Sequence, residues 1–251
     1  MSSFVVGSLA TSAQAAVAWD APAGATSTFS WANGQSANGF YGSPLITDTG
    51  MFFTPGLFSS IQTNGGMTTI SDFLTVDLAI TQPDSGPRKQ FTSFRVMQFG
   101  DFQLIGTASA NIVGGLEITT VESLPAQPGF VPAANGSVFN NNDVSNYRHY
   151  TGTTSDPVDP QPFSAAIDSG SITRLWDGSL EVILPAGVTR VRFQLTNSMT
   201  TTASNGGAAT IQMKAVQNPF TIEVFAADIP EPASMMVLGA AGMLILKRRR
   251  A

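Results

Sequence analysis

Side chains that commonly act as catalysts are scarce in this chain. Histidine is the most frequent general acid or base in enzymes, and the 251 residues contain one, His149, in the polar stretch NYRHY. No G-x-S-x-G stretch accompanies it as the nucleophile of a hydrolytic triad. We therefore interpret His149 as a surface side chain beside Tyr147 or Tyr150, and we predict no catalytic residue in the chain.

Paired carboxylates are a second kind of catalyst, because a glycoside hydrolase needs two of them about 5 to 9.5 Å apart. The pairs closest in sequence are Glu117 with Glu122 and Asp177 with Glu181. Asp177 precedes Gly178 and is predicted to lie in a turn. Glu181 alternates with the apolar residues of SLEVIL, which places it on the solvated face of a strand. We expect neither pair to act in catalysis.

Metal ligands are equally few. The chain has no cysteine, which excludes a disulfide, a thiol nucleophile and a Cys-ligated zinc. Calcium needs six to eight oxygen ligands, and oxygen-bearing side chains gather at residues 140–143 and at Asp156 and Asp159. Because the spacing of a D-x-D-x-D-G loop is absent, we interpret them as solvated turn residues and predict no metal and no cofactor.

Two tryptophans are candidates for binding sugar, because aromatic faces stack on the CH groups of carbohydrates. Trp31 lies in a Gly- and Asn-rich segment near Tyr41, and Trp176 lies beside the predicted turn at Asp177 and Gly178. Each is a candidate ligand platform. The alternative interpretation places each of them in the core or at its edge.

The composition indicates the class of protein. Hydrophobic residues make up 43%, enough for a core, and charged residues only 12%, against about 25% in an ordinary soluble domain. The formal net charge is -5 although four basic residues, Lys247, Arg248, Arg249 and Arg250, lie together at the C-terminus. The body of the chain is therefore more acidic still, which makes it a poor partner for nucleic acid.

Alternation of apolar and polar residues predicts β-strands. In the stretch VTRVRFQLT, Val191, Phe193 and Leu195 fall on one face. The stretches SITRLW and SLEVIL flank Asp177-Gly178, a pair that favours a two-residue hairpin turn. With a further turn at residues 185–187, these three strands are predicted to form a meander.

Other candidate strands are residues 69–80, 91–99, 101–113, 115–121, 209–216 and 219–226. About ten strands without an amphipathic helix predict an all-β fold, an antiparallel two-sheet sandwich or jelly roll. We assign this domain to residues 16–228. The polar stretch 135–162 is too long for an ordinary connection, and we expect a surface excursion there.

The N-terminus has features of a signal peptide. A short apolar run is followed by Ala13-Gln14-Ala15, the small-x-small pattern that signal peptidase accepts. No Lys or Arg precedes the run, so we expect the natural start to lie upstream of Met1. We predict that residues 1–15 are a cleavable signal segment, with Ala16 the first residue of the mature protein.

The C-terminus has features of a membrane anchor. Residues 233–246 carry no charge and would span roughly 21 Å as a helix, short of a hydrocarbon core of about 30 Å. The basic cluster 247–250 would hold its end in the cytoplasm, where its long side chains snorkel and the bilayer thins locally. Pro230 and Pro232 keep the entry extended. We predict a tail at residues 229–251 with a transmembrane helix at 233–246.

Pro230-Glu231-Pro232, the apolar run and the basic end follow one another in this order at the terminus. Together they resemble the PEP-CTERM sorting signal of exported bacterial proteins, a resemblance confined to the tail. It implies that an exosortase, a membrane protease or transpeptidase, recognises the tripeptide. It also implies an inner-membrane precursor that is delivered to the cell surface or the extracellular matrix.

These observations predict an exported protein of structural, adhesive or carbohydrate-binding type that is not an enzyme. Its processing partners would be signal peptidase and an exosortase, and its leading ligand class is extracellular polysaccharide. The alternative is an exported hydrolase that acts on extracellular polysaccharide.

Overall fold

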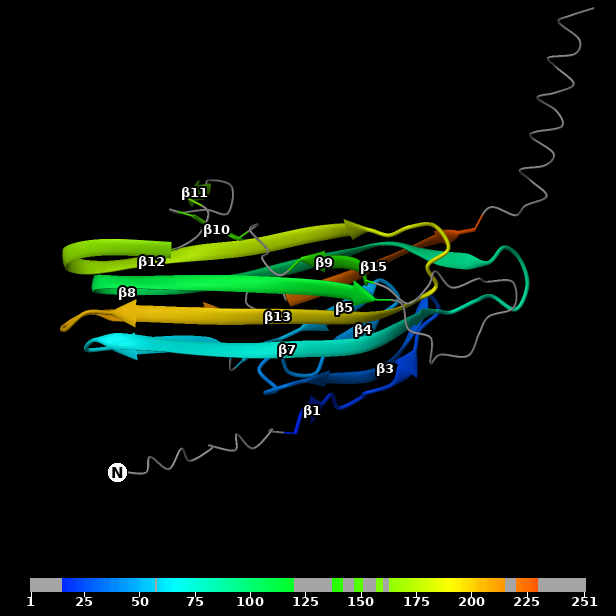
Figure 1. The fold of residues 1–251 in the computed structure, drawn as a ribbon, viewed down its shortest axis with the longest axis horizontal. Helices are drawn as coiled ribbons and strands as arrows, with labels where there is room; N and C mark the ends of the chain where they lie inside the picture. The colour runs from blue at the N-terminus through cyan, green and yellow to red at the C-terminus, as the bar shows by residue number, and fades with distance from the viewer. Residues whose placement is uncertain are drawn as a thin grey trace, which may run out of the picture.

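The computed structural model describes residues 15–56, 58–119, 137–141, 147–150, 157–159, 163–214 and 220–229 (Figure 1). For residues 137–141, 147–150, 157–159 and 163–170 it describes the course of the backbone only. The cleavage residue Ala13, the motif at 230–232 and the apolar run at 233–246 with its basic end lie outside the described residues. Within the described ranges no helix has the length and apolarity needed to cross a membrane.

The described residues form one antiparallel sheet of 15 strands and contain no helix. The strands are β1 (Val17–Ala18), β2 (Gly24–Ala25), β3 (Phe29–Ser36), β4 (Leu45–Thr47), β5 (Gly50–Phe53), β6 (Ser59–Thr63), β7 (Gly66–Ile80), β8 (Lys89–Thr119), β9 (Ser137–Asn141), β10 (Tyr147–Tyr150), β11 (Pro157–Asp159), β12 (Phe163–Ile183), β13 (Arg190–Ala203), β14 (Ala208–Met213) and β15 (Phe220–Asp228). The all-β, antiparallel prediction is confirmed. The strands join in one continuous sheet, however, where the sequence led us to expect two.

The sheet bends back on itself at one end, and β8 marks the line of the bend. Ala203, the last residue of β13, lies opposite Ala108 of β8, whereas Ala208, the first residue of β14, lies opposite Ile105. Between these two positions Gly106 has a φ of 65°, a left-handed conformation that glycine adopts at little cost. Residues 89–105 and 107–119 of β8 therefore lie in different halves of the sheet.

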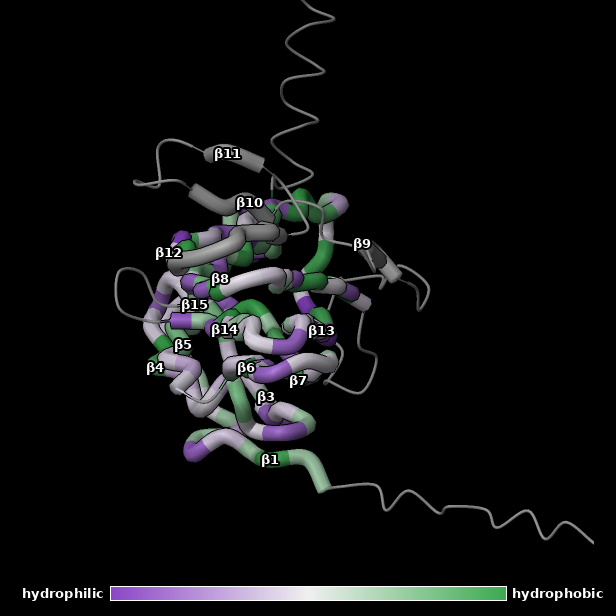
Figure 2. Tube along the Cα trace, turned by 90° about the vertical axis from the view of Figure 1, so that its left-hand side faces the viewer, coloured by the Kyte–Doolittle hydropathy of each residue, from purple (hydrophilic) through white to green (hydrophobic). Residues whose placement is uncertain are grey.

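The neighbouring strands bend at the same line. β6 ends at Thr63 and β7 begins at Gly66, and in the turn between them Asn64 has a φ of 57°. The register of β12 shifts between Ala166 and Ser171, and its doubling back is visible at the left-hand end of Figure 1. Figure 2 looks along the strands from this end and shows hydrophilic and hydrophobic residues mixed along the chain.

The bend defines two half-sheets. The first half-sheet consists of β3, β7, β13 and residues 107–119 of β8. The second half-sheet consists of β5, β6, β14, β15, residues 89–105 of β8 and residues 171–183 of β12.

The core lies between the half-sheets, and strands contribute alternate side chains to it. In β13 the buried residues Val191, Phe193 and Leu195 face inward, while Arg192 and Gln194 on the opposite face are only partly buried. The alternation predicted from the sequence is confirmed for this strand.

Aromatic rings fill another part of the core. Phe53 stacks on Phe220 with ring centroids 4.7 Å apart, and Tyr41 lies edge-on to Phe58 at 5.2 Å. All four side chains are at most 1% exposed. Such pairs add about 0.5–1.5 kcal/mol each beyond the burial of their area, so this cluster holds β5 and β15 to the segment around Tyr41.

A buried polar cluster links the two half-sheets. The carboxamides of Gln98 on β8 and Asn197 on β13 hydrogen-bond to each other in both directions, at 2.7 and 3.1 Å. The hydroxyl of Tyr41 donates to the same Asn197 oxygen at 2.7 Å. Because a buried polar group left without a partner costs about 1–3 kcal/mol, the cluster favours the one register in which these three residues meet.

Two local predictions for β12 were wrong. The strand continues through Asp177 and Gly178, which pair with Phe99 and Gln98 of β8, so no hairpin turn forms there. Pairing along β8 satisfies the backbone groups of the whole stretch, and this outweighs the local turn preference. The three-strand meander is absent as well, because residues 171–183 of β12 pair with β8 in the second half-sheet whereas β13 lies in the first. The turn at residues 185–187 is confirmed, with Gly187 at a φ of 87°.

Gly100 provides a test of the packing between β8, β12 and β14. A Cβ added there would lie 2.0 Å from the carbonyl oxygen of Gln212 and 2.3 Å from the ring of Trp176. We expect Gly100→Ala to lower the free energy of unfolding by about 3 kcal/mol, because overpacking forces neighbouring backbone to move. Urea denaturation measures this.

Gly56→Ala is the matched control for this substitution, since nothing lies within 4 Å of a Cβ added at Gly56. Equal denaturation midpoints for the two variants would contradict the close packing at Gly100.

Candidate functional site

Trp176 is not the exposed platform that its sequence context suggested. The side chain is 1% exposed and belongs to the core. Its indole N–H donates to the backbone carbonyl of Asp101 at 3.3 Å, and its ring lies over Gly100, the position that leaves room for it. Because the ring faces are covered by protein, Trp176 cannot stack on a sugar in this structure.

Trp31 is partly buried at the edge of the core. Its ring lies 6.4 Å from that of Phe29, and a Cβ on Gly24 would fall 2.3 Å from it. The indole N–H donates to the carbonyl of Ala21 at 3.0 Å. The ring therefore holds the segment 21–25 against β3, and this contact takes up the surface that a ligand platform would need.

The other candidates from the sequence come from several strands. His149 belongs to β10, where its backbone is in register with Trp176 and with Asp159 of β11. Glu181 is on the solvated face, as predicted, 4.0 Å from Arg95. Glu122 lies outside the described residues.

No cluster of three or more His, Cys, Asp or Glu side chains that could hold a metal ion occurs among the described residues. Asp156 and residues 142–143 of the candidate calcium ligands lie outside them.

A groove of about 520 Å³ lies on the outer face of the first half-sheet. Its described lining comes from the N-terminal segment, β3, β7 and β13, and consists of Ala18, Pro22, Asn33, Gly34, Gln35, Phe73, Thr75, Arg192 and Gln194. Adjacent strands bring these residues together, because Arg192 is in register with Asp77, and Gln194 and Gln35 both with Thr75. The volume of the groove is far larger than that of the cavity between the half-sheets, which is about 10 Å³.

An ion pair supports one end of the groove. The guanidinium of Arg192 donates from Nε and Nη2 to the two carboxylate oxygens of Asp77, at 2.7 and 2.9 Å. Asn33 donates its amide to the same carboxylate at 2.7 Å. Asp77 is 1% exposed and Arg192 is 42% exposed, and the hydrogen bond that Arg192 donates to Asp77 raises the pKa of Arg192. The pair fixes the orientation of a partly exposed guanidinium at the surface of the groove.

A bulge in β3 places Asn33 beside Asp77. The register of β3 against β7 shifts between Ala32 and Gln35, and Asn33 has a φ of 57°. Asparagine adopts this left-handed conformation more readily than most residues. The bulge therefore turns the Asn33 amide toward the carboxylate and leaves Gln35 over Thr75.

The wall of the groove is an N-terminal strap, residues 17–22, held in place by Trp19. The indole is 4% exposed and lies 5.5 Å from the ring of Phe53. A Cβ on Gly34 would fall 2.2 Å from it, so this position leaves room for the ring. Backbone hydrogen bonds join Trp19 N–H to Gly34 and Gly34 N–H to Pro22, each at 3.0 Å. The strap is thereby packed against β3.

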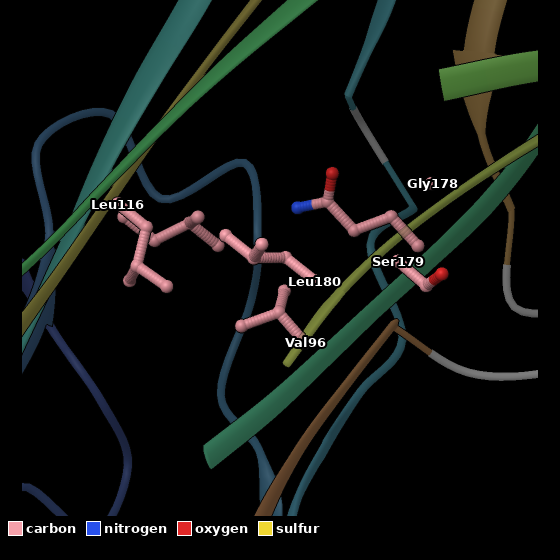
Figure 3. Close-up of a pocket in the computed structure, with 7 residues that line it drawn as sticks. Val96, Leu116, Gly178, Ser179 and Leu180 are labelled. Atoms are coloured by element: carbon pink, nitrogen blue, oxygen red, sulfur yellow. The ribbon is translucent and has the colours of Figure 1, made fainter. Parts of the chain in front are cut away.

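A second cavity lies between the half-sheets and is shown in Figure 3. It is lined by Val96, Gln98, Leu116, Leu195 and residues 178–180, and its volume is about 10 Å³. That is room for about one water molecule. The cavity is therefore a packing feature beside the buried polar cluster and is too small for an organic ligand.

The groove residues were not predicted from the sequence, although Phe73 carried one signal. In β7 the residues Leu74, Val76 and Leu78 are buried in the core, so Phe73 falls on the polar face with Thr75. Phe73 is 38% exposed. An aromatic residue on the polar face of an alternating strand is the pattern that could have identified it.

Comparison with known proteins shows no family for this chain. No protein-family model and no curated protein matches the chain. Among solved structures, the enzymatically active domain of tailspike protein 4 from bacteriophage CBA120 aligns with 63% of this chain and 19% of its own, at 12% identity and a TM-score of 0.15. This chain thus spans about a fifth of that domain.

Two carbohydrate-binding modules also align. A family 29 module covers 67% of this chain and 90% of its own at 11% identity, with a TM-score of 0.14. The family 11 module from Clostridium thermocellum, solved with a β-1,3-1,4-mixed-linked tetrasaccharide, covers 63% and 88% at 9% identity, with a TM-score of 0.12. Similarities this weak carry no argument about what the chain binds.

Removing the Trp19 ring tests the strap. We expect Trp19→Ala to release residues 17–22, because the side chain is the buried anchor of that segment. The lost packing should lower the free energy of unfolding by about 3–5 kcal/mol. Hydrogen exchange should show lost protection at the amides of Trp19 and Gly34. Leu45→Ala, at a side chain that is 70% exposed, is the control, and retained protection in Trp19→Ala would contradict the anchoring role.

Proposed function

We propose that the β domain is a non-catalytic carbohydrate-binding domain of an exported protein. The observation that carries the proposal is the groove, where an exposed aromatic ring lies among flat, hydrogen-bonding side chains. Binding sites for small molecules commonly occupy about 300–1,000 Å³ and combine apolar surface with a few convergent polar groups. The groove, at about 520 Å³, is within that range.

The chemistry of the lining suits a sugar. Asn33, Gln35 and Gln194 carry carboxamides, each with two N–H donors and a carbonyl acceptor. The hydroxyl groups of a sugar both donate and accept, so they match such side chains. Phe73 supplies a partly exposed ring on which the apolar CH face of a sugar can stack. The bidentate bond to Asp77 holds Arg192 still, which lowers the entropy cost of using it as a donor.

Binding is favoured over hydrolysis by the same lining. A glycoside hydrolase needs two carboxylates facing its substrate, and none of the described residues that line the groove is a carboxylate. Asp77 lies beneath the surface and already accepts three hydrogen bonds. An exported hydrolase therefore remains the second candidate.

Export and sorting are supported by the sequence of the two ends. The small-x-small triplet at 13–15 and the PEP-CTERM-like tail at 229–251 imply processing by signal peptidase and by an exosortase. β15 ends at Asp228, directly before the tail, so the proposal requires no strand of the domain to be removed with it.

The sorting proposal predicts two cuts. Mass spectrometry of the exported protein should find Ala16 as its first residue and should find the basic end missing. Replacing Pro230, Glu231 and Pro232 by alanine should leave the uncut chain in the inner-membrane fraction. Export of a chain that still carries its basic end would contradict the role given to the tripeptide.

The binding proposal predicts a loss of affinity when the groove is altered. On a glycan array the full-length chain should bind polysaccharide, and Phe73→Ala and Gln194→Ala should each weaken that binding about tenfold, which is about 1.4 kcal/mol. The reason is the loss of a stacking face in one variant and of a hydrogen-bonding amide in the other. Isothermal titration calorimetry measures the affinities.

Ile183→Ala is the control, because Ile183 is 81% exposed and belongs to β12, outside the groove. If all three variants bound as the unaltered chain does, the groove would not be the binding site. Release of reducing sugars during the assay would favour the hydrolase.

A further inference from the structure

The charges around the groove narrow the class of glycan. We propose that the groove selects uncharged polysaccharide chains, and that Asp77 sets this selectivity by neutralising Arg192. The inference rests on the proposed function, since it concerns the ligand of the same groove.

Arg192 is the single charged side chain among the described residues that line the groove. Its Nε and Nη2 atoms lie 2.7 and 2.9 Å from the oxygens of Asp77, whose carboxylate is 1% exposed beneath the guanidinium. A cation and an anion in contact act on a third charge as a dipole, because their opposite Coulomb terms largely cancel. A ligand carboxylate in the groove would therefore gain little from Arg192.

Other charges near the groove do not restore an excess of positive charge. Glu117 on β8 is in register with Gln194 on β13, and Asp20 is an exposed residue of the strap. Arg190 lies two residues before Arg192 on the same face of β13 and is only partly buried. These anions at least balance the cations, so an acidic sugar would lose hydration without finding a compensating charge.

The polar groups of the groove suit hydroxyls instead. The hydroxyl oxygen of Thr75 is buried and has no hydrogen-bond partner in the part of the chain that the structure describes. Thr75 is in register with Gln35 of β3 on one side and with Gln194 of β13 on the other. A row of one hydroxyl and two carboxamides can donate to and accept from neutral sugar hydroxyls, whereas a carboxylate only accepts.

The first test compares polymers that share a backbone. Polygalacturonate and alginate are each presented to the purified full-length chain beside their carboxyl-reduced forms, with neutral β-glucan as a further probe, at low and at high salt. We expect the reduced polymers and the β-glucan to bind about tenfold more tightly than the acidic polymers. We expect salt to change their affinity little, because no ligand charge is involved.

Two results of this test would overturn the inference in different ways. Tighter binding of the acidic polymers, with an affinity that falls as salt rises, would overturn the selectivity and leave the carbohydrate-binding proposal intact. Binding to none of the polymers would overturn the proposed function and this inference with it.

The second test removes the neutralising charge. Asp77→Asn keeps the size of the side chain and leaves Arg192 without its counter-ion, so it should raise the affinity for polygalacturonate about tenfold and make that affinity salt-dependent. Its affinity for the reduced polymer should not rise, because that polymer carries no charge for Arg192 to attract. Asp101→Asn is the matched control, because Asp101 forms an ion pair with Lys214 and does not line the groove.

A melting curve first establishes that the Asp77→Asn variant is folded. If the variant does not fold, the selectivity for uncharged polysaccharide is tested on the unaltered chain. The test is then the comparison of acidic with reduced polymers and the salt dependence of their binding. A folded Asp77→Asn with unchanged affinity for polygalacturonate would overturn the role of Asp77.

Discussion

The bend shared by neighbouring strands is the constraint on which the rest of the structure depends. β8 turns at Gly106, and the turns beside it are hydrogen-bonded to each other, since Asn64 N–H donates to the carbonyl of Gly207 at 2.9 Å. A left-handed residue other than glycine costs about 1–2 kcal/mol, so Gly106 suits the sharpest point of the turn. Because adjacent strands bend together, the sheet keeps its backbone pairing while its two halves come to face each other.

The facing halves must then agree in register. A slip of one residue would exchange the inward and outward faces of a strand, and the core contains a polar cluster that such a slip would leave unsatisfied. Gln98 and Asn197 come from different half-sheets and are 99 positions apart in the chain, yet they form two hydrogen bonds. The hydrophobic contacts around them supply most of the stabilisation, whereas the amide pair specifies which residues meet.

The outer face of the first half-sheet follows from the same arrangement. β3, β7 and β13 lie side by side, which places Asn33, Asp77 and Arg192 in contact although they come from three strands. The strap adds a wall because Trp19 fits beside a glycine of β3 and against Phe53. The groove therefore joins a rigid strand surface to a peripheral segment, a combination in which side chains are oriented before a ligand arrives.

Strand content and inward-facing residues were predictable from the sequence, because alternation is a local property of consecutive residues. Val191, Phe193 and Leu195 illustrate this, since all three are buried as expected. Asp177-Gly178 shows the limit, because a local turn preference yielded to pairing with a distant strand. The sequence alone thus determined the all-β class and the inward face of β13, and it is the sole basis for the proposed signal segment and sorting tail. Only the tertiary structure decided that the sheet is continuous, that Trp176 is buried and that a groove exists, because each depends on contacts between residues far apart in the chain.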